Sequence, residues 1–345
     1  MIAVAVSGGV DSLMAAYLLK QQTTELFAVH FLTGFEARHE ADRLPIHAIG
    51  DQLGIAVRVL DVRDEFRANV VDYFTAAYRS GRTPNPCVIC NPAIKFGAVL
   101  RYAESLGARA LATGHYAAVR TDPTGRRRLH KGVDPRKDQS YFLARLSQEQ
   151  LAKAVFPLGS MSKDDVRALA SRHGLQPVET TESQDICFVK SGAYTDLLQT
   201  AEESAPTPGP IETLDGRIVG QHAGLAGFTI GQRRGINCPA DAPYYVVRLD
   251  PEQNRLVVGA KDDLLARRCR VERINWIAPP PTGPIRVHAR VRYRTPEAAA
   301  TVMPLDGATA GLEFDQPQSA LTPGQAAVFY EGDAVLGGGF IARGR

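Results

Sequence analysis

The sequence has few of the features that mark secreted or membrane proteins. Of its 345 residues, 5 are cysteine and 1 is tryptophan. An odd, thinly spread set of thiols argues against a secreted disulfide framework and leaves metal binding or catalysis open. No apolar run approaches the roughly 18 residues that a membrane span needs, and MIAVAVSGG at the start is not a secretory leader. We therefore expect a soluble, cytoplasmic protein with no membrane partner.

Net charge is also small, but basic residues are locally concentrated. The formal charge is +3, while arginine and lysine cluster at 126–132, 231–235 and 286–294. Such clusters suit a polyanionic partner, although a solvated surface explains any one of them equally well.

The order of apolar runs predicts three domains. Up to residue 115, runs such as 2–6 and 26–32 alternate with segments of helical spacing, which predicts an α/β domain with a parallel sheet covered on both sides. Beyond residue 200, short β-type runs separated by turns and two proline-rich breaks predict two small, mainly antiparallel β domains. We place the domains at 1–200, 205–265 and 267–345, the last as a β-barrel.

A glycine-rich stretch follows the first apolar run. In AVSGGVDS at 5–12, Gly8 and Gly9 let the backbone approach an anion, and Ser7 and Ser12 add hydroxyl donors at the start of a predicted helix. The alternative is an ordinary capped glycine turn. The stretch is neither a Walker A nor a dinucleotide loop, but it resembles the pyrophosphate loop (PP-loop) of ATP pyrophosphatases. On this interpretation Asp11 would help to hold Mg²⁺.

Three cysteines are candidates for chemistry. Cys87 and Cys90 follow a Pro-Asn-Pro run that predicts a rigid loop, and Cys187 lies in the loop-like stretch ESQDICFV. A C-x-x-C pair fits a redox pair, a zinc half-site or iron–sulfur ligation, and zinc is disfavoured because a second pair is missing. Cys187 alone would also fit a small buried residue.

Several further stretches carry a family resemblance over the whole chain. They are GRTPNPCVICNPAIKF, ATGHYA, DPRKDQSYFL, ESQDICF, GQHAGLAGFTIGQRRG and TPGQAAVFYEGDAVLGGG, in this order. With the loop at 5–12, they make the chain similar to the tRNA-specific 2-thiouridylases, a family of the PP-loop superfamily. The resemblance implies a tRNA-uridine 2-sulfurtransferase. ATP would adenylate the C2 oxygen of the wobble uridine, and a persulfide sulfur would displace AMP.

The resemblance also implies roles for individual residues. Cys187 would carry a persulfide received from a sulfur-relay protein or cysteine desulfurase, and Cys90 would attack it and close a Cys90–Cys187 disulfide. The ATP contacts would be Ala5, Val6, Ser7, Gly8, Gly9, Val10, Asp11, Ser12, Leu32 and Gly114. The tRNA contacts would be Asn85, Pro86, Cys87, His115, Lys137, Asp138, Gln139, Arg292, Tyr293 and Gln325.

Cys87 departs from the family, because many members have aspartate at this position. Cys87, Cys90 and Cys187 together form a ligand trio of the kind that holds a 4Fe-4S cluster with one open iron. Such a cluster excludes the Cys90–Cys187 disulfide. The C-x-x-C spacing favours the cluster, and the persulfide route stays open beside it.

Two other classes of function remain as alternatives. A PP-loop synthetase would adenylate a small-molecule acceptor, but the sequence offers no glutaminase signature to supply ammonia. A non-catalytic RNA-binding protein with a relic loop is disfavoured by the intact SGGVDS stretch.

Overall fold

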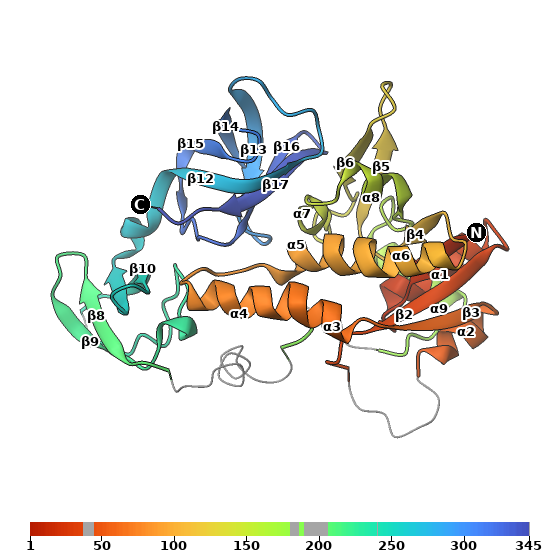
Figure 1. Ribbon diagram of the computed structural model, residues 1–345, viewed down its shortest axis with the longest axis horizontal. Helices are drawn as coiled ribbons and strands as arrows, with labels where there is room; N and C mark the ends of the chain where they lie inside the picture. Colours follow the sequence, from red (N-terminus) through yellow and green to blue (C-terminus); the bar gives the residue numbers. More distant parts are fainter. Residues whose placement is uncertain (37–44, 180–185, 190–205, 240, 345) are drawn as a thin grey trace.

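The computed structural model describes residues 1–36, 45–179, 186–189, 206–239 and 241–344. Figure 1 shows an elongated molecule, with an α/β domain at one end, a small β domain at the other and a barrel between them on one side. This arrangement confirms the predicted fold class of an α/β domain followed by two β domains.

The α/β domain is built on a parallel sheet with the strand order β3-β2-β1-β4-β7. Its strands are β1 (Ile2–Ala5), β2 (Leu26–Leu32), β3 (Ala56–Asp61), β4 (Ala110–Ala112) and β7 (Ala154–Val155). Alternate residues of β1 face opposite layers, since Val4 packs in one core cluster and Ala3 and Ala5 in another. The apolar run at 56–62 predicts a further strand buried on both faces, which is wrong for β3 because it is an edge strand with an exposed face.

Helices cover both faces of this sheet. They are α1 (Val10–Lys20), α2 (His47–Leu53), α3 (Arg63–Phe66), α4 (Asp72–Arg79), α5 (Pro86–Cys90), α6 (Leu100–Ser105), α7 (Ser140–Leu143), α8 (Gln148–Lys153) and α9 (Lys163–Arg172). Two π-helices, η1 (Arg67–Val71) and η2 (Asn91–Val99), join α3 to α4 and α5 to α6. The result is two continuous helical rods, which lie side by side in Figure 1.

The C-x-x-C pair lies on a helix, so the predicted rigid loop is wrong for the cysteines themselves. Asn85 is the N-cap of α5, and Pro86 occupies its first position. Proline is tolerated there because the first helical N–H has no partner within the helix. The loop therefore ends at Asn85, and Cys87 and Cys90 stand one turn apart on the same side of α5.

The small β domain has the strand order β10-β11-β8-β9. Its elements are β8 (Gly209–Thr213), β9 (Ile218–His222), η3 (Leu225–Gly227), β10 (Tyr245–Asp250) and β11 (Arg255–Gly259). We expected antiparallel pairing, and β11 against β8 corrects this, because these two strands run parallel. They are separated in the chain by β9 and β10, so a crossover connects them rather than a hairpin.

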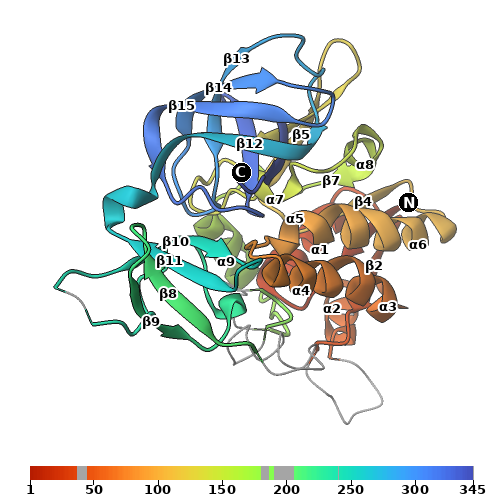
Figure 2. The same ribbon diagram turned by 60° about the vertical axis from the view of Figure 1, so that its left-hand side comes forward.

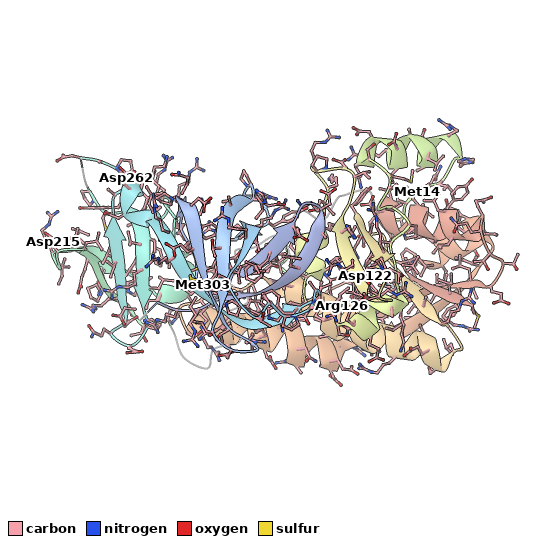
Figure 3. All side chains as sticks on the ribbon, turned by 90° about the horizontal axis from the view of Figure 1, so that it is seen from above. Met14, Asp122, Arg126, Asp215, Asp262 and Met303 are labelled. Carbon is pink, nitrogen blue, oxygen red and sulfur yellow. The ribbon has the colours of Figure 1, made fainter. Side chains whose placement is uncertain are left out.

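The C-terminal domain is a closed barrel that borrows a hairpin from the first domain. Its strands, after the short η4 (Lys261–Leu264), are β12 (Leu265–Trp276), β13 (Ile285–Arg290), β14 (Ala298–Pro304), β15 (Ala310–Ser319), β16 (Ala326–Glu331) and β17 (Ala334–Ile341). Pairing of β12 with β17 closes it. The hairpin of β5 (Ala117–Thr121) and β6 (Arg127–Lys131) joins the edge of β17. Figure 3 shows Arg126 of this hairpin between Met14 of the first domain and Met303 of the barrel.

Three core clusters belong to single domains, but a fourth crosses a domain boundary. It combines Phe74 and Tyr141 of the first domain with Val328, Tyr330 and Phe340 of the barrel. The barrel is thus packed onto the first domain rather than tethered to it. Within the described residues, no helix is long and apolar enough to cross a lipid bilayer.

Candidate active site

The glycine-rich stretch forms a tight turn between β1 and α1. Gly8 has φ +98°, a conformation that favours glycine, and Gly9 is the N-cap of α1. The Ser12 hydroxyl accepts from the Ser7 N–H at 3.2 Å and donates to the Gly9 carbonyl at 3.0 Å. The turn lies at the carboxyl end of β1, where the sheet order diverges toward β2 on one side and β4 on the other. Ligands of open α/β sheets bind at such switch points.

Glycines also determine what can lie against this turn. A Cβ at Gly114 would stand 2.8–2.9 Å from backbone atoms of Asp11 and Ser12, so only glycine allows the segment after β4 to approach so closely. A Cβ at Gly9 would meet only the Ser7 hydroxyl, at 3.8 Å. The turn is therefore supported at Gly114 and open at Gly9, which leaves room for an anion at the N-terminus of α1.

Asp11 forms a buried ion pair that the sequence analysis did not anticipate. Both of its carboxylate oxygens lie 2.7 Å from the Lys163 ammonium, and the Tyr116 hydroxyl donates to Oδ1 at 2.7 Å. The Lys163 side chain is 3% exposed, whereas that of Asp11 is 34% exposed. Lys163 is the first residue of α9, which has a capping box formed by Ser162 and Asp165. This pair places a buried positive charge directly behind the phosphate loop.

The same pair bears on the predicted Mg²⁺ ligand. Because the Lys163 ammonium contacts both oxygens of Asp11, this arrangement does not fit a metal ion at that carboxylate. Coordination of Mg²⁺ by Asp11 would require Lys163 to move. Binding of Mg²⁺ by Asp11 therefore stays a prediction.

The segment before the cysteine helix is held by all three domains. Thr83 N–H donates to the Pro323 carbonyl at 2.8 Å, and Gln325 Nε2 donates to the Thr83 carbonyl at 2.9 Å. The Thr83 hydroxyl also donates to that of Thr229 in the small β domain, at 3.3 Å. The position of α5, and hence of its thiols, is fixed where the three domains meet.

The three candidate thiols are close enough for the charge of one to shift the pKa of another. Burial and, to a smaller extent, the charge of Cys187 raise the pKa of Cys87 to about 11, and the Lys95 ammonium opposes this shift. Burial also raises the pKa of Cys90 to about 12, while the nearby Lys95 ammonium opposes this shift. Cys187 itself is exposed. Cys90 is half-buried and Cys187 is the more exposed thiol, although burial raises the pKa of both.

An aromatic side chain anchors the segment that carries Cys187. The neighbouring Phe188 is buried, and its ring centroid lies 5.2–5.7 Å from those of Phe35, Phe66 and Phe74. Burying a phenylalanine side chain stabilises a fold by about 1.5–3 kcal/mol. This anchor holds Cys187 near α5.

Lys95 and His115 form a second polar cluster beside the thiols. Lys95 lies on η2, five residues after Cys90, and its ammonium is 3.3 Å from His115 Nε2. His115 Nδ1 is 2.7 Å from the Thr113 hydroxyl. Burial, aided by the Lys95 charge, holds the pKa of His115 well below its ordinary value. The neutral imidazole accepts from Lys95 at Nε2 and donates from Nδ1 to Thr113.

Cys87, Cys90 and Cys187 are also the predicted ligands of a 4Fe-4S cluster. Among the described residues, no set of three or more histidine, cysteine, aspartate or glutamate side chains is placed to hold a metal ion. Cys87, Cys90 and Cys187 are therefore not grouped around a single metal ion in the described part of the chain. The cluster stays an untested prediction, and no step is derived through it.

Most residues predicted to contact tRNA are tied into the protein. Asp138 is buried and accepts from Ser140, Gln139 Oε1 accepts from the Tyr116 N–H, and Arg292 donates to the Ile230 carbonyl of the small β domain. Asn85 lies near the Tyr141 hydroxyl, which donates to the Ala326 carbonyl at 2.9 Å. The ring centroid of Tyr293 lies 4.3 Å from that of Phe142. The structure gathers Asn85, Gln139 and Tyr293 around α7. Their contacts with RNA remain predictions.

Lys95, Thr113, Tyr116 and Lys163 were missed by reasoning from sequence. Lys95 follows the C-x-x-C pair by one π-helical turn, a signal that requires knowledge of the helix type. Lys163 follows a serine N-cap signal but lies far from the loop in sequence, so its pairing with Asp11 could only be found in the fold.

Comparison with known proteins places the chain in a family. Residues 1–191 match the tRNA methyl transferase HUP domain, 196–260 its PRC-barrel domain and 266–341 the aminomethyltransferase beta-barrel domain. A tRNA-specific 2-thiouridylase MnmA of Desulfosudis oleivorans is 54% identical over 99% of this chain and 94% of its own length. That of Moorella thermoacetica is 48% identical over 98% of both chains.

A more distant likeness exists among solved structures. The U34-tRNA thiolase NcsA from Methanococcus maripaludis, with its 4Fe-4S cluster, is 19% identical, with a TM-score of 0.36, over 58% of this chain and 63% of that one. We draw nothing about the site from it. The fold and site define a HUP-domain protein with a phosphate loop and neighbouring thiols. The full-length matches show that the chain belongs to the tRNA-specific 2-thiouridylase family.

Proposed function

We propose that this chain is an ATP-dependent sulfurtransferase that converts the wobble uridine of tRNA anticodons to 2-thiouridine. The observation that carries the proposal is the 54% identity, over 99% of the chain, to a relative named for this activity. The phosphate loop, the three neighbouring thiols and the locally basic surface support it.

The loop side of the site is suited to adenylation. The first N–H groups of α1 have no partner within the helix and, with the space left at Gly9, would bind the phosphates of ATP. The uridine C2 oxygen would attack the α-phosphorus, which makes the C2 carbon susceptible to a sulfur nucleophile.

The thiol side is suited to a sulfur relay between Cys187 and Cys90. The exposed Cys187 would receive a persulfide from a protein donor. Because burial raises the pKa of Cys90, a base must first take the proton of its thiol. The resulting thiolate would attack the Cys187 sulfur, and the bond to the terminal sulfur would break with its electron pair leaving on that sulfur. The released sulfur displaces AMP from C2, and a Cys90–Cys187 disulfide forms. A thiol reductant must then return two electrons.

Binding of RNA would supply the free energy to extract the base. Flipping a base out of its stack costs a few kcal/mol, which contacts to the remaining tRNA must offset. Arg233 and Arg234 of the small β domain are exposed and free to face a phosphate backbone. Arg126 instead donates to the carbonyls of Ile277 and Ala278, so part of the basic cluster at 126–132 is structural.

Thiolation in vitro tests the proposal. The chain, ATP, Mg²⁺, unmodified tRNA, cysteine and a cysteine desulfurase would be combined, with AMP and 2-thiouridine both quantified. We expect tRNA-dependent AMP release. Cys90→Ser and Cys187→Ser should keep it but lose thiolation, whereas the matched control Cys269→Ser, in the barrel, should keep both. AMP release with a small acceptor and no tRNA would favour a synthetase, and tRNA binding without AMP would leave a non-catalytic protein.

Cys87 separates the two sulfur routes within the same assay. If the relay operates alone, Cys87→Asp retains much of the thiolation in air. If the trio holds a 4Fe-4S cluster, losing any one thiol removes visible absorption and activity together. Anaerobic purification with iron and sulfide counting gives the second readout. Full aerobic activity of an iron-free parent protein would exclude the cluster.

A further inference from the structure

A pocket outside the candidate active site lies at the seam between the first domain and the barrel. Its volume is about 190 Å³, whereas a water molecule needs roughly 10–15 Å³ of such space. It is lined by Tyr73 and Ser80 from the end of the α4 rod and by Glu272, Arg273 and Phe340 from β12 and β17. Figures 1 and 2 both show the barrel seated over these rods.

The charges around this pocket are strongly unbalanced. The positive charges of Arg273, Arg145 and Arg82 all lower the pKa of Tyr73, although burial raises it overall. Glu272 is the one acid among the described lining residues, and it is paired with Arg82 at 3.4 Å. Three guanidinium groups therefore lie near one carboxylate, whose recorded ion pair is with Arg82.

Arg145 and Arg273 lie against the same aromatic ring, and their positive charges repel each other. The Arg145 and Arg273 guanidiniums lie 4.9 Å and 5.1 Å from the centre of the same Phe340 ring. Arg145 also donates to the Arg273 carbonyl, and its buried Nε has no hydrogen-bond partner among the described residues. Burial and the charge of Arg273 both lower the Arg145 pKa. An anion in the pocket would relieve this repulsion.

The backbone at this point is shaped to present Arg273. The pairing of β12 with β17 shifts register between Glu272 and Asn275, and Arg273 has φ +54°. β-Bulges of this kind re-aim a side chain, and a positive φ in a residue with a long side chain is sparsely populated unless the surroundings enforce it. A strained backbone that exposes an arginine beside two others indicates a binding role.

We propose that Tyr73, Arg82 and Arg273 line a phosphate-binding pocket, supported by the nearby positive charge of Arg145, that takes one phosphodiester of the bound tRNA. The pocket rests on the proposed function for its ligand. Arginine forks and a phenol hydroxyl suit phosphate oxygens. Arg82 directly precedes the Thr83–Asn85 segment that leads into α5, so a phosphate held here would also steady the start of the cysteine helix.

Salt-dependent tRNA binding tests the pocket. Log affinity falls as log salt concentration rises, and each lost phosphate contact reduces the magnitude of this slope by about 0.7–0.9. We expect Arg273→Gln to lower the slope by this amount and to weaken binding about tenfold, as for one charge-assisted contact, with Arg273→Lys recovering part of the slope. The matched control is Arg268→Gln, an exposed barrel arginine that pairs with Glu313 outside the pocket and outside the three basic clusters.

The outcomes separate this proposal from the proposed function. If the parent protein binds and thiolates tRNA but Arg273→Gln keeps the full slope, the pocket assignment alone is overturned. If the parent does not bind tRNA, both fall. If inorganic phosphate raises the melting temperature of the parent but not of Arg273→Gln, while their tRNA slopes agree, the pocket takes free phosphate and the RNA assignment is wrong.

Discussion

At the scale of single residues, the structure shows the interaction partners of side chains that the sequence could identify only as candidates. Asp11 stands in a stretch whose chemistry is readable from the sequence, because glycines and hydroxyls before a helix predict an anion site. Its pairing with Lys163 was unreadable, since 152 residues separate the two. Local pattern predicts the phosphate loop, while the charge behind it follows from the tertiary fold.

We predict that Asp11→Ala abolishes AMP formation and destabilises the protein, with tRNA affinity nearly unchanged. Removing one partner of a buried pair costs about 3–5 kcal/mol, and we expect the lower end because a third of the Asp11 side chain is exposed. Asp11→Ala with Lys163→Met should be more stable than Asp11→Ala alone, because the double variant also removes the buried ammonium that has lost its Asp11 partner. Urea unfolding measures both. Strictly additive losses would contradict the pairing, and normal adenylation by Asp11→Ala would refute the loop assignment.

At the scale of elements, the sequence located the cysteine pair but misjudged its backbone. Pro84 and Pro86 suggest a loop, yet a proline is compatible with the first position of a helix, and α5 begins there. The continuation as η2 has no sequence signature of its own. It is braced from outside, because Gln150 Nε2 donates to the carbonyls of Pro92 at 2.8 Å and Phe96 at 3.0 Å.

We predict that Gln150→Ala loosens η2 and thereby displaces Lys95 and Cys90. Two carbonyls lose a donor, which should lower the free energy of unfolding by about 1–3 kcal/mol. Thiolation should fall more than tRNA binding, and amide exchange in 91–99 should accelerate. Gln52→Ala removes an amide that bonds the Ala48 and Gln176 carbonyls on the exposed surface, so it is the matched control. Equal exchange in both variants would contradict the bracing.

At the scale of the whole molecule, domain types were predictable and domain contacts were not. Alternating apolar runs indicated the α/β domain, and turn-rich β runs indicated the rest. Nothing local shows that Tyr141 and Phe340 share one core, or that a hairpin of the first domain continues the barrel sheet. The basic cluster at 126–132, which the sequence offered as a polyanion site, is largely this hairpin.

We predict that Gly324→Ala weakens the seam between the barrel and the cysteine segment. Gly324 has φ +89°, and a Cβ there would lie 2.9 Å from Arg82 Cβ and 3.1 Å from the Thr83 backbone. A strained φ alone costs about 1–3 kcal/mol. Calorimetry should show a lower melting temperature, and thiolation should fall. Gly307→Ala, where nothing lies within 4 Å, should behave like the parent protein. Equal melting of both variants would exclude the seam as a weak point.

The borrowed hairpin has a consequence for synthesis on the ribosome. Lys131 at the end of β6 donates to the Gly332 carbonyl, 201 residues later, and His130 pairs with Ala334 of β17, the strand that also closes the barrel. Until β17 has left the exit tunnel, the barrel is open and the hairpin edge is unpaired. Unpaired edges invite aggregation and proteolysis. A translation product truncated before β17 should therefore aggregate or be degraded by proteases. Only a chain that includes β17 can form the contacts between the first domain and the barrel that position the thiols.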